Sequence, residues 1–355
     1  MRVVFLGLSI TSSWGNGHAT NYRALVRALE ERGHDVLFLE RDVEWYRANR
    51  DLPDPPHGRT ELYDSVEELT HRFAGDVAEA DLVVVGSYVP HGIDVARWVT
   101  STARGVRAFY DIDTPVTVSA LERGDCSYLS TELVPAFDLY LSFTAGPTLA
   151  VLRERFGCRR PSAFHCLVDP DAYPPLHEPQ RWDLGYLGTY SDDRQPVLER
   201  LLLEPARQRP ELRFVVAGPQ YPPTIEWPGN VERIEHLAPS QHPAFYAAQR
   251  VTLNVTRSDM VRAGWSPSVR LFEAAACAVP VVSDRWEGLD SFFVPGEEIL
   301  VADDAGDVVE ALDTLDRSRR QEIGRRARER VLAEHTAQAR VAELERMTLD
   351  LLAPR

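Results

Sequence analysis

The segment AGWSPSVRLFEAAACAVPVVS, residues 263–283, joins a helix signal directly to a strand signal. Ser266 is a residue type that caps helices and Pro267 suits the first helical position, so we expect a helix to start here. The apolar run Val279–Ser283 that follows has the composition of a buried parallel strand. A helix joined to a buried strand in this way is typical of doubly wound α/β sheets.

The start of this helix has the chemistry of an anion site. Free N–H groups and the helix dipole at Ser266 and Ser268 suit a diphosphate, and Arg270 adds a positive charge. Glu273 lies about seven residues into the helix, roughly 10 Å along its axis, which is near the reach from a diphosphate to its ribose. We predict that Glu273 binds the ribose hydroxyls. A buried structural glutamate paired with an arginine is the alternative.

Strand and helix signals alternate along the rest of the chain in two series. The expected strands of the first series are Val3–Leu8, Val36–Leu39, Leu82–Val85, Arg107–Tyr110 and Leu139–Phe143. Those of the second series are Leu184–Leu187, Arg213–Ala217, Val251–Val255 and Val279–Ser283. The pattern predicts an α/β protein with two Rossmann-like domains that face each other across a cleft and bind ligands at the carboxyl ends of their strands.

Proline content and composition indicate the domain boundaries. The segment VDPDAYPPLHEPQR, residues 168–181, has the proline density of an interdomain linker. We therefore predict an N-terminal acceptor domain at residues 1–167 and a C-terminal donor-binding domain at residues 182–335. Residues 317–352 are rich in Arg, Glu, Ala and Leu and predict one or two amphipathic helices. We expect residues 336–355 to form a C-terminal helix that packs back on the N-terminal domain.

Composition excludes several classes of function. The 355 residues have a net charge of −15, which argues against a nucleic-acid partner. No run approaches the ~20 apolar residues of a membrane span and the N-terminus lacks a signal-peptide core, so we expect a cytoplasmic protein. Lysine is absent, so a cation that binds phosphate has to be arginine. We expect four scattered cysteines to stay reduced, namely Cys126, Cys158, Cys166 and Cys277.

Turns in the first half combine titratable groups with backbone that a ligand can approach. Gly17 and His18 lie in SSWGNGHATNY, directly after the first strand, where His18 is a candidate catalytic base at a helix start. A capping or spacer role is the alternative for His18. Asp111 and Asp113 end another strand and are candidates for a general base or for binding acceptor hydroxyls, with a turn or cap as the alternative. Acceptor-side candidates after a third strand are Tyr88 and His91.

In the second half, the loop LGTYSDDR follows the first strand and ends at Arg194. Gly188 and the adjacent Thr189 allow close approach of a ligand to the backbone, and Arg194 can form a bidentate contact with phosphate. A surface salt bridge from Arg194 to Asp192 or Asp193 is the alternative.

Taken together, these segments resemble the CgeB-like glycosyltransferases, relatives of glycosyltransferase family 4 with the GT-B fold. The resemblance spans nearly the whole chain and includes SSWGNGHATNYRALVRAL, GSYVPHGIDVARW, FYDIDTPVT, YLGTYSDDRQ and SPSVRLFEAAACAVPVVSDRWEGLDSFF. It implies that Glu273 holds the donor ribose, that Arg194 braces the diphosphate, and that backbone groups at His236 and Leu237 contact the nucleobase. It further implies that His18, Asp111 and Asp113 lie near the reacting sugar.

One position departs from the family pattern. In family 4 the ribose-binding glutamate is the second of an E-x7-E element, whose first glutamate contacts the donor sugar, and Trp265 occupies the place of that first glutamate here. This replacement leaves the sugar and the anomeric outcome open.

The resemblance implies a glycosyltransferase that moves a sugar from a nucleoside-diphosphate sugar, with UDP- or dTDP-sugar favoured, to an acceptor hydroxyl. The acceptor is a small molecule, a glycan or a protein. No metal or other cofactor is expected, because a helix start and arginines can neutralise the leaving diphosphate. One alternative is a nucleotide-sugar epimerase or hydrolase of the same fold. The other is a catalytically inactive nucleotide-sugar-binding module, which Trp265 alone favours.

Overall fold

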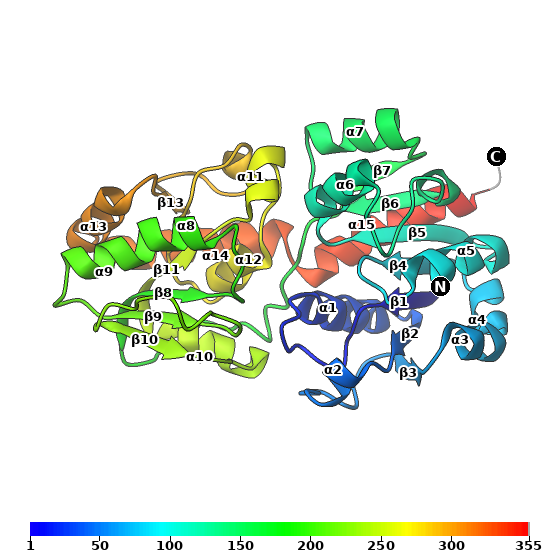
Figure 1. Ribbon diagram of the computed structural model, residues 1–355, viewed down its shortest axis with the longest axis horizontal. Helices are drawn as coiled ribbons and strands as arrows, with labels where there is room; N and C mark the ends of the chain where they lie inside the picture. Colours follow the sequence, from blue (N-terminus) through cyan, green and yellow to red (C-terminus); the bar gives the residue numbers. More distant parts are fainter. Residues whose placement is uncertain (354–355) are drawn as a thin grey trace. The chain divides into compact units, whose positions relative to one another are not determined.

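The computed structural model describes residues 1–353 and divides them into two compact units (Figure 1). Unit 1 consists of Met1–Leu167 together with a C-terminal segment that begins at Ala337. Unit 2 is Val168–Thr336. Each unit has its own parallel sheet and its own hydrophobic core.

The sheet of unit 1 has seven strands in the order β3-β2-β1-β4-β5-β6-β7, and all neighbouring strands are parallel. Apolar side chains bury the central strands on both faces, as in β4, where every residue is buried. Ligands of doubly wound sheets bind where the strand order reverses, which here is the carboxyl end of β1 and β4. The strands are β1 (Arg2–Gly7), β2 (Asp35–Arg41), β3 (Arg59–Tyr63), β4 (Leu82–Gly86), β5 (Val106–Asp111), β6 (Leu139–Ser142) and β7 (Pro161–Ala163).

Helices connect these strands. α1 (His18–Glu31) buries Tyr22, Leu25 and Leu29 at helical spacing, which directs one face of the helix to the core. α6 (Thr114–Arg123) begins with a proline in its first turn and ends at Gly124 in the left-handed conformation, as helix boundaries favour. The others are α2 (Glu44–Arg47), α3 (Val66–Arg72), α4 (Ala74–Glu79), α5 (Gly92–Thr102), η1 (Val134–Ala136) and α7 (Pro147–Phe156).

The sheet of unit 2 has six strands in the order β10-β9-β8-β11-β12-β13, again all parallel. Its strand order reverses between β8 and β11, so the carboxyl ends of these two strands mark the expected ligand position. The strands are β8 (Trp182–Leu187), β9 (Phe214–Ala217), β10 (Val231–Ile234), β11 (Gln249–Asn254), β12 (Val281–Ser283) and β13 (Leu300–Val301).

The helices of unit 2 include one built almost entirely of buried residues. α12 (Val269–Ala276) buries seven of its eight residues, from Arg270 to Ala276. α8 (Gln195–Leu198), η2 (Glu199–Leu203) and α9 (Glu204–Gln208) follow one another without a break. The others are η3 (Pro239–Gln241), α10 (His242–Ala247), α11 (Ser258–Ala263), η4 (Leu289–Ser291), α13 (Ala305–Thr314) and α14 (Arg317–Glu334).

The chain returns to unit 1 through α15 (Ala337–Leu352), which packs beside α1 (Figure 1). Val341 and Leu344 are fully buried in this contact. Glu345 accepts hydrogen bonds from Arg32 and lies 2.6 Å from His34 Nε2, so polar contacts also hold the helix. Val168 and Thr336, the first and last residues of unit 2, form an isolated β-bridge.

Two sequence predictions are corrected. The helix expected from Ser266 starts at Val269, because residues 266–268 remain outside the helix and Ser268 occupies the cap position. Four strands were not predicted, namely β3, β7, β10 and β13. β3 and β10 contain charged residues at partly exposed edges of their sheets, and β7 and β13 are very short, so none has the long apolar run that marked the other strands.

Candidate active site

In unit 2, the candidate donor residues gather around the start of α12 and the end of β8. Ser268 Oγ donates a hydrogen bond to Asn254 Oδ1 at 2.7 Å, so this hydroxyl does not cap the helix. The Leu271 N–H donates to the Ser268 carbonyl, and the N–H groups of Val269 and Arg270 keep their capacity to bind an anion. Ser266 is buried just before the helix.

Arg270 is buried and fixes the start of α12 to the end of β8. Its Nε donates to the carbonyl of Leu187, and its Nη1 donates to Asn254 Oδ1 at 2.9 Å. The guanidinium carbon lies 4.6 Å from the centroid of the Tyr186 ring. These hydrogen bonds run to neutral oxygens, so the charge of Arg270 remains available to a nearby anion.

Gly188 is required by this packing. A Cβ on Gly188 would lie 2.7 Å from Arg270 Nη2 and 2.6 Å from the Tyr186 hydroxyl. Its carbonyl would in turn lie 2.0 Å from a Cβ on Gly218, at the end of the neighbouring strand β9. The two glycines therefore let the backbone at the carboxyl ends of β8 and β9 close up around the arginine.

The Arg194 guanidinium uses only part of its hydrogen-bonding capacity. Its Nη2 donates to the Thr189 carbonyl at 2.8 Å, while its Nε is buried and has no hydrogen-bond partner within residues 1–353. The alternative salt bridges are not formed: Asp192 accepts from the Tyr190 hydroxyl, and Asp193 accepts from the Ser258 backbone N–H. Because a buried N–H without a partner is unfavourable, a ligand oxygen would improve this site.

Glu273 is buried on α12 and is held by tyrosines instead of the arginine that we considered. The Tyr173 hydroxyl donates to its Oε1 at 2.7 Å, and the Tyr246 hydroxyl donates to its Oε2 at 3.3 Å. His242 Nδ1 lies 3.9 Å from Oε2, and burial lowers the pKa of His242. Glu273 is the fifth residue of α12, nearer to the helix start than the sequence suggested.

His236 and Leu237 follow β10, at the carboxyl edge of the same sheet. His236 is exposed, and the Leu237 carbonyl accepts a hydrogen bond from His242 Nε2 at 3.3 Å. His242 therefore connects this loop to the neighbourhood of Glu273.

In unit 1, three of the candidates come together at the carboxyl edge of the sheet. His18 is the first residue of α1, after Gly17, and its Nε2 lies 3.8 Å from Asp113 Oδ2. The ring centroids of His18 and Tyr88 are 5.5 Å apart. His18 Nδ1 is buried and has no hydrogen-bond partner in the described part of the chain. The backbone N–H of His18 donates to Asn16 Oδ1, which fixes the start of the helix.

Asp111 has a different environment from Asp113. It is fully buried and accepts hydrogen bonds from the Tyr140 hydroxyl at 2.5 Å and the Thr117 hydroxyl at 2.7 Å. Burial raises the pKa of Asp111 to about 6, although these hydrogen bonds act to lower it. Its contacts are those of a residue that holds β5, β6 and α6 together.

Tyr88 and His91 both adopt the left-handed backbone conformation, with φ of 63° and 55°. Such conformations are uncommon for residues other than glycine and often occur in functional loops. His91 is exposed at the start of α5, while the ring of Tyr88 lies 4.6 Å from that of Tyr128. Tyr88 thus belongs to the His18 group, and no ring contact joins His91 to it in the described residues.

Two residues that the sequence did not single out organise these sites. Asn254, at the end of β11, accepts from both Ser268 and Arg270 through one carbonyl oxygen. Glu40, buried at the end of β2, accepts four hydrogen bonds from the loop after β1. Each is a polar residue at the carboxyl end of an apolar strand, which is the signal that could have identified them.

The described residues contain no group of three or more His, Cys, Asp or Glu side chains that could hold a metal ion. No helix within residues 1–353 has both the length and the apolar character that a bilayer crossing requires.

Comparison with known proteins identifies the fold. Residues 194–346 match the model of a family described as glycosyl transferase-like. No match to a curated protein was found. Sucrose-phosphate synthase from Thermosynechococcus elongatus has a similar structure, with a TM-score of 0.72 and 16% identity over 99% of both chains.

Two further structures have the same fold. The Anabaena HepE protein in complex with UDP and glucose has a TM-score of 0.73 and 13% identity, over 99% of this chain and 100% of that chain. An alpha-glucosyltransferase in complex with UDP-glucose and DNA containing an abasic site has a TM-score of 0.73 and 12% identity, over 98% and 99%. The prediction of two parallel-sheet α/β domains of the GT-B type is confirmed. Fold and family match together support a glycosyltransferase of this type.

Proposed function

We propose that the protein transfers a sugar from a nucleoside-diphosphate sugar, a UDP- or dTDP-sugar, to an acceptor hydroxyl without a metal ion. The observation that carries the proposal is the pair of arginines at the carboxyl edge of the sheet in unit 2. Arg194 has a buried N–H without a partner, and Arg270 directs its charge to the same strand end. Two of the similar structures are complexes with UDP and glucose or with UDP-glucose, which favours UDP for this chain.

The leaving diphosphate would be stabilised by these arginines and by the first turn of α12. Breaking the bond between the anomeric carbon and the diphosphate oxygen leaves negative charge on the diphosphate and positive charge on the sugar. Fixed N–H donors aimed at the developing negative charge lower the barrier without a metal. The Thr189 carbonyl, the Leu187 carbonyl and Asn254 hold the two guanidinium groups in place before the donor binds.

We place the base that deprotonates the acceptor hydroxyl at His18. Asp113, 3.8 Å from His18 Nε2, would stabilise the imidazolium that forms when His18 takes the proton. Asp111 would act as a positioning residue, because both of its oxygens accept from buried hydroxyls. Glu273 would bind the ribose after Tyr173 or Tyr246 gives up its hydrogen bond to the carboxylate.

The proposal is tested by incubating the full chain with UDP-glucose or dTDP-glucose in EDTA and following the nucleoside diphosphate by chromatography. We expect the nucleotide to be released and the reaction to persist without metal. Analysis of the sugar product separates transfer from hydrolysis and epimerisation. A chain that binds UDP but releases none from either donor, with a crude glycan extract as acceptor, would instead be a binding module.

A further inference from the structure

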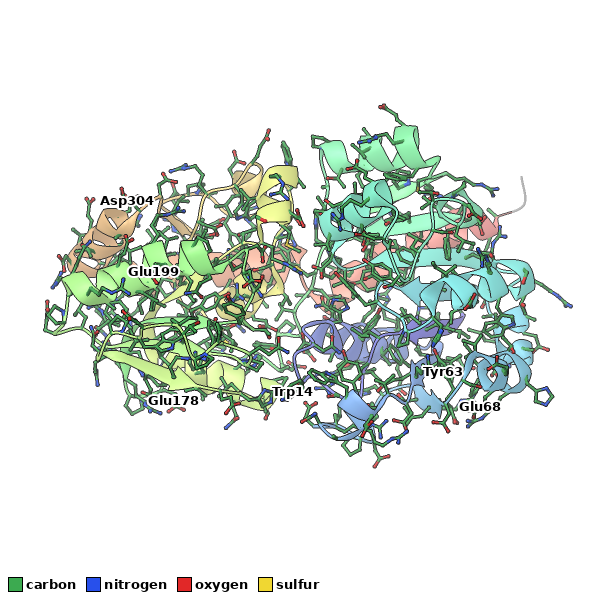
Figure 2. All side chains as sticks on the ribbon, viewed as in Figure 1. Trp14, Tyr63, Glu68, Glu178, Glu199 and Asp304 are labelled. Carbon is green, nitrogen blue, oxygen red and sulfur yellow. The ribbon has the colours of Figure 1, made fainter. Side chains whose placement is uncertain are left out.

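Two tryptophans of unit 1 form an aromatic pair. Trp14 lies between β1 and α1, and Trp45 lies on α2. Their ring centroids are 4.4 Å apart and their planes meet at 76°. Trp45 is 51% exposed and Trp14 is half-buried, and Figure 2 shows Trp14 on its loop near α2. About half of the Trp45 surface therefore remains open to solvent beside the edge-to-face contact.

Hydrogen bonds join the two loops that carry this pair. The Ser12 hydroxyl donates to the Asn49 carbonyl at 2.7 Å, and the Leu52 N–H donates to the Thr11 carbonyl at 3.1 Å. The Asn49 amide donates to the Trp45 carbonyl at 2.9 Å, which closes the turn after α2. The rings are therefore held in place by backbone that is itself fixed.

A buried carboxylate adds to this rigidity. Glu40 accepts from the hydroxyls of Ser9 and Thr11 and from two backbone N–H groups of the same loop. These contacts stabilise the loop without covering either indole. A half-exposed aromatic pair on a rigid backbone can bind a ligand with little loss of conformational entropy.

The surroundings of the pair identify the kind of ligand. Trp45 is the one exposed large hydrophobic residue in the segment 1–167, so a lipid or an apolar peptide would find no further apolar surface nearby. Three nearby arginines are paired with carboxylates: Arg47 and Arg50 with Asp42, and Arg23 with Asp51. Glu44, exposed next to Trp45, is in no ion pair among the described residues. An anionic ligand would be repelled there, whereas a carboxylate can accept a hydrogen bond from a hydroxyl of a neutral ligand.

We propose that the Trp14–Trp45 pair binds a neutral sugar ring of the acceptor, so that the protein glycosylates a carbohydrate. A pyranose has one face of C–H groups, which stacks on an indole, and a rim of hydroxyls, which polar side chains can bind. Two exposed polar residues, Arg47 and Asp51, follow shortly after Trp45 in the sequence. Trp14 lies on the loop that leads from β1 into α1, and His18 is the first residue of that helix, so we assign the stacked sugar to the acceptor that the proposed base deprotonates. This inference rests on the proposed function for its role in transfer.

The test measures carbohydrate binding and donor binding separately. The full chain, saturated with UDP, is titrated with maltohexaose, cellohexaose, chitohexaose and mannohexaose, with saturation-transfer NMR as the readout. We expect at least one of them to bind. Trp45→Ala and Trp45→Leu should weaken that binding at least tenfold, about 1.4 kcal/mol, whereas Trp45→Phe should stay within about threefold because it keeps an aromatic face.

Leu349→Ala is the matched control, because Leu349 is 56% exposed on α15 and is equally apolar. All variants should bind UDP with unchanged affinity and unfold at the same temperature. Absence of binding by all four oligosaccharides, or binding that Trp45→Ala leaves intact, would overturn the inference. Preferential binding of 4-methylumbelliferone at the pair would also overturn it, in favour of an aromatic acceptor. Failure of wild type to bind UDP, with oligosaccharide binding intact, would instead count against the proposed function.

Discussion

Arg194→Ala should weaken nucleotide binding more than any other single change in unit 2 that leaves the fold intact. In the free protein Arg194 makes one hydrogen bond to a neutral carbonyl, so its loss should lower the free energy of unfolding by about 1 kcal/mol. A bound diphosphate would meet the unpartnered Nε and the second face of the guanidinium. Losing a charge-assisted contact of this kind costs about 1.5–3 kcal/mol, which corresponds to roughly 10- to 150-fold in the dissociation constant for UDP.

The assay is isothermal calorimetry with UDP in EDTA, at low and at moderate ionic strength. Arg194→Lys keeps the charge but not the planar fork, so we expect an intermediate affinity. Arg262→Ala is the control for charge alone, because Arg262 is 68% exposed on α11 and pairs with Asp259. If Arg194→Ala binds UDP within twofold of wild type, or if Arg262→Ala loses as much affinity, the diphosphate does not contact Arg194.

The other predictions concern the base, the two buried carboxylates and the metal. His18→Ala and Asp113→Asn should leave the UDP affinity unchanged, and turnover of His18→Ala should fall by about 10²–10⁴; rates within a few-fold of wild type would move the base elsewhere. The pKa of Asp111 is raised to about 6 in the folded state, so the free energy of unfolding of wild type should fall by on the order of 2–3 kcal/mol as pH rises from 4 to 7. Urea unfolding of Asp111→Asn at the same pH values should not show this decrease. Glu273→Gln, which still accepts from the Tyr173 hydroxyl, should weaken UDP binding about tenfold by calorimetry, and an unchanged affinity would assign it to packing. UDP at 100 times its dissociation constant should stabilise the fold by about 2.7 kcal/mol in EDTA, and stabilisation that requires added Mg²⁺ would contradict the metal-free mechanism.

The sequence predicted those parts of the fold in which one local pattern dominates. β4 is buried throughout, and β1 and β11 contain buried runs from Val3 to Gly7 and from Val251 to Asn254. The alternation of such runs with helices is sufficient to predict a doubly wound topology. β10 escaped prediction because its sequence, VERI, has two charged residues in four, and only its pairing with β9 makes it a strand. Strands at the edge of a sheet depend on tertiary contacts, which a local sequence pattern does not show.

The start of α12 shows a similar limit. Pro267 suits a first helical position, but Trp265 takes a left-handed conformation with φ of 44° and its N–H donates to the Glu287 carbonyl. That long-range contact keeps the chain outside the helix until Val269. The hydrogen-bond partners of the candidate site residues could not be predicted either. The Tyr173 hydroxyl donates to Glu273 across one hundred positions of sequence, and no local pattern indicates that pairing.

The return of α15 to unit 1 determines the order in which the chain can fold during synthesis. Unit 2 is continuous, from Val168 to Thr336, and can fold as it emerges. Unit 1 begins first but needs Ala337 and the residues after it, which the ribosome adds only after all of unit 2, about 10–30 s later at typical rates. Until then the surface of α1 that α15 covers is open to water. The earliest part of the chain is therefore the last to be complete, and a ribosome stalled within unit 2 would leave an aggregation-prone N-terminal fragment.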